Sequence, residues 1–146
     1  MAFFVVEPEA SGRPDGRGAP GGEVSCTFDT WLGDDLVRAH PLLLVTAPLN
    51  KALEALKAPR GFSLAPARAT TSAFFQSHDP GRRLPSFWSL EVKGRPAVDD
   101  MGMAGDGSLV ASARVVRVMG RFTLKHATFS QYVPATENRA AQTVAT

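Results

Sequence analysis

The stretch Leu43-Leu-Val-Thr-Ala47 has a counterpart about 66 residues later, Leu109-Val-Ala-Ser-Ala113. In each stretch a short apolar run of strand length ends in a hydroxyl residue, Thr46 or Ser112. The hydroxyl oxygen of such a residue can accept a hydrogen bond from the free N–H groups at the start of a helix. Each stretch therefore predicts a strand that leads directly into a capped helix.

The residues that follow each stretch have the apolar spacing of an amphipathic helix. Apolar residues lie at i, i+3, i+4 and i+7, counted from Leu49 in the first copy and from Val115 in the second. This spacing gives each helix one apolar stripe that faces a core. The two stripes consist of Leu49, Ala52, Leu53, Leu56, Val115, Val118, Met119 and Phe122.

The similarity continues on both sides of the two stretches, with slips of one residue. An acidic pair precedes each strand, Asp34-Asp35 and Asp99-Asp100, and strand-like sequence resumes after each helix. We therefore predict an α+β fold that forms a single compact domain over residues 1–133, with helices packed on a mainly antiparallel sheet. Two similar β-β-α-β halves, residues 24–69 and 87–133, are expected to build it. The alternative is coincidence, because any strand-to-helix unit shares part of this pattern.

A Gly- and Pro-rich segment from Ala10 to Gly22 contains almost nothing apolar, so we predict a flexible loop there. Gly16, Gly18 and Gly21 match the spacing G-x-G-x-x-G. A dinucleotide site needs that spacing between a strand and a helix, whereas Pro20 interrupts it and a strand is expected next. We therefore expect no cofactor from this motif. Residues 134–146 are predicted to form a flexible tail.

Three other segments have recognisable patterns. Phe3 to Glu7 is aromatic and β-branched, which predicts a first strand. Thr70 to Arg83 is expected to be a strand or turn that leads into a loop. Leu84 to Gly94 alternates, with Trp88, Leu90 and Val92 on one face, which is typical of a half-buried antiparallel strand.

The charges of this 146-residue chain nearly balance, with 16 Lys and Arg against 14 Asp and Glu and a formal net charge of +2. A nucleic-acid-binding domain usually has a stronger basic bias gathered in one patch, so nucleic acid is the less favoured partner. The longest apolar run, Leu42 to Val45, is far shorter than the roughly 18 residues of a membrane-spanning helix. The first residues lack the features of a secretory signal, and a single cysteine, Cys26, fits a reducing compartment. We expect a cytoplasmic protein that does not bind a membrane.

Candidate catalytic and metal-ligating residues are few and scattered. Cys26, His40, His78 and His126 have no neighbours at the spacing of a zinc site, and no local catalytic motif is present. We therefore predict no metal, no cofactor and no enzymatic activity. The alternative is a small enzyme whose active site is assembled by the fold, with a deep pocket lined by His78 or His126 and a carboxylate.

Two sets of charged residues are candidates for binding a partner. The acidic set is expected to lie on loops, where turn and cap hydrogen bonds are the simpler explanation and contact with a partner is the functional one. The basic set falls at i, i+3 and i+7 on the second predicted helix, and Lys125 extends it; it forms either a solvated face or a contact surface for an acidic protein. The sets are Asp34, Asp35, Asp99 and Asp100, and Arg114, Arg117 and Arg121.

The repeated Leu-Val-x-Ser/Thr unit with its helix, the segment Leu84-Pro-Ser-Phe-Trp-Ser-Leu-Glu-Val-Lys-Gly94 and the following Val98-Asp-Asp-Met-Gly102 resemble bacterial immunity proteins of polymorphic toxin systems. The most similar group is immunity protein family eleven, and the resemblance covers mainly Trp31 to Tyr132. It implies a small cytoplasmic α+β protein without enzymatic activity that binds a cognate toxin domain and blocks its active site. A toxin with a basic cleft would contact the acidic set, and an acidic toxin would contact the basic set.

A nucleic-acid-binding regulatory module is a further alternative to the immunity role. It would bind in a salt-dependent manner through Arg117 and Arg121. Only Phe122 lies near these basic residues, and it belongs to the predicted apolar stripe, whereas RNA or single-stranded DNA is usually bound with interleaved aromatic residues. Recognition of a protein is therefore the preferred interpretation. The sequence does not predict an oligomeric state.

Overall fold

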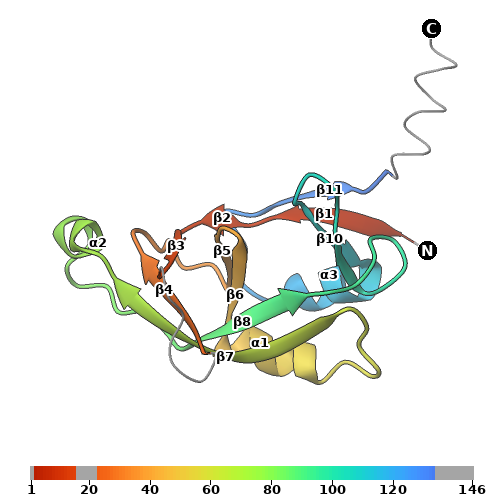
Figure 1. Cartoon of the computed structure of the whole chain (residues 1–146), viewed down its shortest axis with the longest axis horizontal. Coiled ribbons are helices and arrows are strands. Elements are labelled where there is room, and N and C mark those ends of the chain that lie inside the picture. Colours follow the sequence, from red (N-terminus) through yellow and green to blue (C-terminus); the bar gives the residue numbers. More distant parts are fainter. Residues whose placement is uncertain (1, 16–22, 134–146) are drawn as a thin grey trace, which may run out of the picture.

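The computed structural model describes residues 2–15 and 23–133, which form eleven strands and three helices (Figure 1). The helices are α1 (Ala47–Glu54), α2 (Ala73–His78) and α3 (Ala113–Met119). The strands are β1 (Phe3–Glu7), β2 (Glu9–Ala10), β3 (Gly12–Pro14), β4 (Val24–Phe28), β5 (Leu36–Ala39), β6 (Leu42–Thr46), β7 (Phe62–Thr71), β8 (Phe87–Val92), β9 (Met101–Met103), β10 (Leu109–Ser112) and β11 (Thr128–Gln131).

The strands form two sheets. The smaller sheet has the order β11-β1-β10-β9 and is antiparallel throughout, and the larger has the order β2-β5-β6-β8-β7-β4-β3. In the larger sheet only the β2–β5 and β4–β7 pairs are parallel. The predicted α+β class and the mainly antiparallel sheet are confirmed.

The two predicted halves do not form equivalent sheets. In the first half β4 pairs with β7, whereas in the second half β8 pairs with β6 and β7, and β11 pairs with β1. The construction from two similar halves is therefore not confirmed. What occurs twice is a local unit. An acidic pair precedes two antiparallel strands, β5 and β6 or β9 and β10, and the second of these strands leads directly into a helix.

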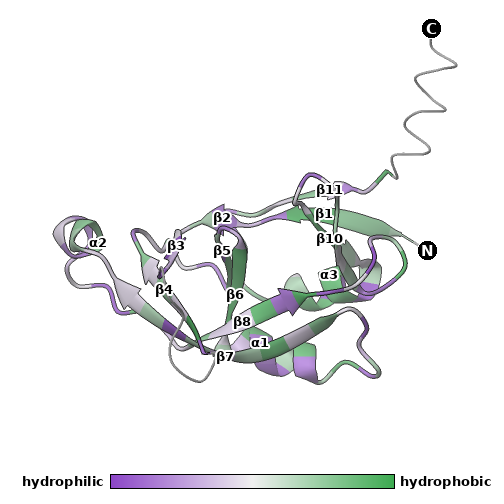
Figure 2. Ribbon diagram, viewed as in Figure 1, coloured by the Kyte–Doolittle hydropathy of each residue, from purple (hydrophilic) through white to green (hydrophobic). Residues whose placement is uncertain are grey.

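The main core lies between the two sheets and the helices α1 and α3. Both apolar stripes contribute to it as predicted: the residues within the helices are buried or partly buried, and Leu56 and Phe122, just beyond the helix ends, pack against the same core. The hydropathy colouring in Figure 2 shows β1 and β6 as largely apolar strands. The fully buried residues of this core include Val6, Leu36, Val45, Leu49, Leu53, Met101, Leu109, Val115 and Met119.

A second core lies on the opposite face of the larger sheet. Successive side chains of a strand point to opposite faces, so Leu43 and Val45 of β6 enter the main core while Leu44 enters the second. Phe28 and Phe87 pack there with ring centroids 4.8 Å apart, and α2 contributes Phe75. The larger sheet is therefore buried on both faces near its centre.

Strand β8 confirms the predicted strand between Leu84 and Gly94, and one correction applies to its second face. Trp88, Leu90 and Val92 face the main core as expected. The opposite face is not simply solvated, because Phe87 is 2% exposed and Ser89 is 7% exposed. The second core covers the start of the strand.

Two other expectations change. The segment Thr70 to Arg83 forms the end of β7 and the helix α2, because the Ser72 hydroxyl accepts a hydrogen bond from Phe75 N–H and caps the helix. Within the predicted loop from Ala10 to Gly22, the residues up to Pro14 form strands β2 and β3 at the two edges of the larger sheet. The G-x-G-x-x-G spacing at residues 16–21 and the predicted tail at residues 134–146 lie outside the described residues. In the described part of the chain, no helix has the length and apolar character needed to cross a membrane.

Candidate functional site

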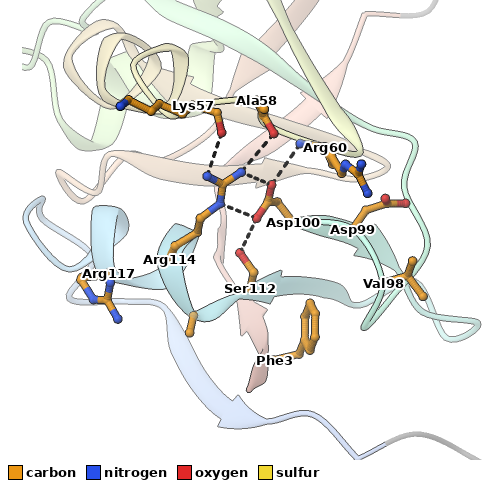
Figure 3. A pocket seen from close by; sticks show the side chains of 11 residues that line it. Phe3, Lys57, Ala58, Arg60, Val98, Asp99, Asp100, Ser112, Arg114 and Arg117 are labelled. Atoms are coloured by element: carbon orange, nitrogen blue, oxygen red, sulfur yellow. Dashed lines mark hydrogen bonds and ion pairs between the residues drawn. The ribbon is translucent and has the colours of Figure 1, made fainter. Parts of the chain in front are cut away.

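The second acidic pair and the start of α3 meet in a network centred on Asp100 and Arg114 (Figure 3). Arg114 Nε lies 2.8 Å from Asp100 Oδ1, and its Nη2 lies 2.6 Å from Oδ2. The Asp100 side chain is only 10% exposed, whereas that of Arg114 is 38% exposed. This two-pronged geometry matches the planar guanidinium to the planar carboxylate and is the strongest form of such a pair.

The same pair also holds the loop that follows α1. Arg114 donates hydrogen bonds to the carbonyl oxygens of Lys57 (2.8 Å) and Ala58 (3.2 Å), and Asp100 Oδ2 accepts one from Arg60 N–H (3.0 Å). Three segments that are distant in the sequence are therefore tied together at one point. The loop from Lys57 to Arg60 cannot leave α3 without breaking charge-assisted hydrogen bonds.

Gly61 permits this close approach. Its φ of +87° is favourable only for glycine, and a Cβ atom there would lie 2.4 Å from Met101 O and 2.8 Å from Asp99 Cβ. The absence of a side chain lets the loop after α1 pack directly on the segment that carries the acidic pair.

Ser112 links this network to the helix. Its hydroxyl donates to Asp100 Oδ1 at 2.8 Å and accepts from Val115 N–H at 3.4 Å, so the predicted helix cap is confirmed. Thr46 occupies the corresponding position before α1, but its hydroxyl donates to Asp35 Oδ1 at 2.6 Å and makes no cap hydrogen bond. The predicted cap is therefore wrong for Thr46.

The pKa of Asp100 is lowered to about 2, first because of its hydrogen bonds from Arg114 and further because of those from Ser112 and Arg60 N–H, against the opposing effect of burial. The carboxylate is thus ionised at neutral pH, and it is paired with Arg114. Asp100 and Arg114, which we predicted for surfaces of opposite charge, largely neutralise each other.

The first acidic pair also serves the fold. Asp34 is 0% exposed, and its carboxylate accepts hydrogen bonds from the backbone N–H groups of Lys125 (3.1 Å) and His126 (2.9 Å). Asp35 accepts from Thr123 N–H at 2.8 Å as well as from Thr46. Asp34 is buried in this fold, and its expected contact with a partner stays a prediction. Both aspartates fasten the chain that follows α3 to the loop before β5.

Asp99 has a third kind of environment. Its carboxylate accepts a hydrogen bond from Arg95 N–H at 2.8 Å, within a short turn, and its side chain lines the pocket described next. The turn chemistry expected for the acidic residues is thus present at this position. The role of the acidic set in binding a partner stays a prediction.

A pocket of about 510 Å³ opens beside the Asp100–Arg114 pair. This volume lies within the range of ligand-binding pockets. Its charged lining contains more cations than anions, and Phe3, Ala58 and Val98 provide apolar wall (Figure 3). The charged side chains are those of Lys57, Arg60, Arg114, Arg117, Asp99 and Asp100.

A second hollow, of about 430 Å³, adjoins the first along α3. Arg114 and Arg117 line both hollows, and Leu56, Val118 and Arg121 complete the second. We call the exposed cations around the two hollows the basic face; it consists of Lys57, Arg60, Arg117 and Arg121. Among the described residues, no carboxylate lies within ion-pair distance of these four side chains.

Only part of the predicted basic strip lies on the helix α3. α3 ends at Met119, so Arg121 and Lys125 belong to the chain after it, and Arg114 is engaged with Asp100. Sequence reasoning did not identify Lys57 and Arg60 as site residues, because they follow α1 without a repeating pattern. The hydrogen bonds that Arg114 and Asp100 make with the loop after α1 bring them to the site.

The histidines named for a dispersed active site lie away from the two hollows. His78 is exposed and stacks on Phe74 with ring centroids 4.0 Å apart, and neither His78 nor His126 lines the two hollows. In residues 2–15 and 23–133, no group of three or more His, Cys, Asp or Glu side chains could hold a metal ion. Cys26 is buried, and burial raises its pKa to about 11.

Comparisons with protein families, with curated proteins and with solved structures found no match to this chain.

Proposed function

We propose that this protein binds an acidic surface of a partner protein through the basic face. The observation that carries the proposal is the unequal use of the two charged sets. The carboxylates of Asp34, Asp35 and Asp100 accept hydrogen bonds from other parts of the fold. Arg117 and Arg121, by contrast, are exposed and have no carboxylate partner among the described residues. Charge that is not neutralised internally remains available to an acidic surface.

The shape of the basic face favours protein recognition. Two adjoining hollows give concave surface next to the charges, and Leu56, Val98 and Val118 supply apolar area there. Protein interfaces combine apolar contact with arginine side chains in this way. Unpaired cations also steer an acidic partner and increase the association rate.

We further propose that the partner is a cognate bacterial toxin domain and that this protein neutralises it as an immunity protein. The resemblance at Leu84 to Gly94 and at the repeated strand-to-helix unit supports this role. On this proposal the contact blocks the toxin and involves no catalysis by this chain, and it takes place in the cytoplasm. The acidic-toxin alternative of the sequence analysis is the one that the basic face favours.

Co-expression tests the proposal. The gene is expressed together with the neighbouring open reading frame, and the complex is isolated through a tag on either chain. We expect a stable complex and rescue of cells from the toxicity of the neighbouring product. Absence of both a complex and rescue would overturn the immunity role, and rescue without any complex would overturn neutralisation by contact.

A further inference from the structure

We propose that the pocket beside the Asp100–Arg114 pair receives an acidic side chain of the partner, a Glu or Asp that lies next to an apolar residue. This inference rests on the proposed function, and it assigns the partner's anchor to one place on the basic face. The pocket is defined by Lys57, Arg60 and Arg117 at its rim and by Phe3 and Val98 on its wall (Figure 3).

The excess of cationic side chains in the pocket lining favours an anionic ligand. Asp100 and Arg114 pair with each other, which leaves Lys57, Arg60 and Arg117 against Asp99 alone. The three cations come from two elements, the loop after α1 and the helix α3, and Figure 3 shows Arg60 on one side of the Asp100–Arg114 pair and Lys57 and Arg117 on the other. A carboxylate that enters would gain interactions from more than one side.

The pocket is held in shape before any partner arrives. Arg114 donates to Lys57 O and Ala58 O, and Asp100 accepts from Arg60 N–H, so the backbone that carries two of the rim cations is fixed to α3. A fixed backbone reduces the ordering cost of binding and increases the affinity obtained from a given set of contacts. The internal ion pair therefore has a positioning role for Lys57 and Arg60.

The size and the apolar wall of the pocket favour an acidic side chain of the partner that has an apolar residue next to it. A volume of about 510 Å³ is much more than one carboxylate fills, and the wall includes Phe3 and the exposed Val98. Beyond Arg117 the surface continues into the second hollow with Leu56 and Val118. A protein segment can occupy both hollows, whereas a free small anion would occupy only one.

The test titrates the full chain with two capped dipeptides, acetyl-Glu-Phe-amide and acetyl-Gln-Phe-amide, and follows backbone amide resonances by NMR. We expect the Glu peptide to shift the amides of Val98, Ala113 and Arg117 and to bind at least about tenfold more tightly than the Gln peptide at low salt. The variant Lys57→Gln/Arg60→Gln should lose this preference. Arg68→Gln, which removes an exposed cation outside both hollows, is the matched control and should keep it.

Equal binding of the two peptides, or shifts confined to other parts of the chain, would overturn the inference. Tighter binding of benzoate than of the Glu peptide would also overturn it and would indicate a free organic anion as the ligand. The dipeptides need no partner protein, so the result is separable from the co-expression test. A complex that forms while the peptides fail to bind would leave the proposed function intact and remove only the pocket as its anchor.

Discussion

Asp100 accepts two hydrogen bonds from Arg114, at 2.8 and 2.6 Å, and this single ion pair joins the acidic loop, the helix α3 and the loop after α1. The pair has a consequence for function as well as for stability. It uses up one cation and one anion of the charged sets and leaves the neighbouring Lys57, Arg60 and Arg117 exposed around a pocket. The basic face is therefore a product of the same contacts that hold the fold together.

Replacement of Asp100 by Asn should destabilise the protein at neutral pH. The lowered pKa, about 2 against an ordinary 3.8, corresponds to about 2 kcal/mol of stabilisation by the ionised form. We expect D100N to reduce the free energy of unfolding by about that amount in urea denaturation at pH 7. Asp79→Asn is the matched control, because the Asp79–Arg82 pair lies on the surface and should contribute less than about 0.5 kcal/mol.

The effect of D100N should depend on pH in a defined direction. Because the folded-state pKa lies below the unfolded-state value, the stabilisation is complete above about pH 4 and is lost as the pH falls toward 2. The difference in unfolding free energy between the native protein and D100N should therefore shrink over this range. A difference that stays constant from pH 7 to pH 2.5 would contradict the assignment of the lowered pKa to Asp100.

Substitution of Asp34 tests whether this residue stabilises the fold. Asp34→Ala leaves the N–H groups of Lys125 and His126 without their buried acceptor, which should cost about 2 kcal/mol of unfolding free energy. Asp34→Asn keeps one amide oxygen as an acceptor and should cost less. Chemical denaturation of both variants is the measurement. Full stability of Asp34→Ala would contradict the structural role described for this residue.

Gly61→Ala should disrupt the loop after α1. The positive φ disfavours any side chain, and the new Cβ would meet backbone and side-chain atoms of the acidic segment at 2.4 and 2.8 Å. We expect a loss of about 2 kcal/mol or more in urea denaturation. Gly81→Ala is the control, because nothing lies within 4 Å of its added Cβ and its φ is not positive. Equal effects at the two positions would show that the close approach at Gly61 does not matter.

The thiol of Cys26 should react slowly in the folded protein. Its side chain is 0% exposed, and burial raises its pKa from 9.0 to about 11, which lowers the thiolate fraction roughly 100-fold near pH 8. We expect its rate of reaction with a chromogenic disulfide reagent to rise at least about 100-fold when urea unfolds the protein. Rapid stoichiometric labelling of the folded protein would contradict the burial of this residue.

The local elements were largely predictable from the sequence, because each depends on neighbouring residues. The spacing of Leu49 and Leu53, and of Val115 and Met119, gave both long apolar stripes, and Phe3 to Glu7 is a strand with the expected bounds. The helix α2 was not predicted, because its six residues are too few to show a helical spacing of apolar residues and Ser72 is its one capping signal. Strand β3 was not predicted, because Gly12 and Pro14 are residues typical of loops. Position 12 requires glycine, since a Cβ atom there would lie 2.1 Å from Thr27 O.

The candidate site was less predictable, because it depends on contacts between distant segments. Periodicity identified Arg114 and Arg117, and the acidic pair identified Asp100, but no local signal indicates that Arg114 and Asp100 bind each other. Lys57 and Arg60 carry no pattern and reach the pocket only through this ion pair. Strand pairing is non-local in the same way. The sequence repeat therefore did not predict that β8 would join the strands of the first half in the larger sheet while β9, β10 and β11 join the smaller one.

Contact between the basic face and an acidic partner can be measured as the affinity of the complex with the neighbouring gene product when Arg117 and Arg121 are both replaced by alanine. Both side chains are exposed, so the double variant should fold normally. We predict at least about 100-fold weaker binding at low salt, a smaller salt dependence than that of the native protein, and no change for the control Arg68→Ala. An affinity that is unchanged in the double variant would contradict the claim.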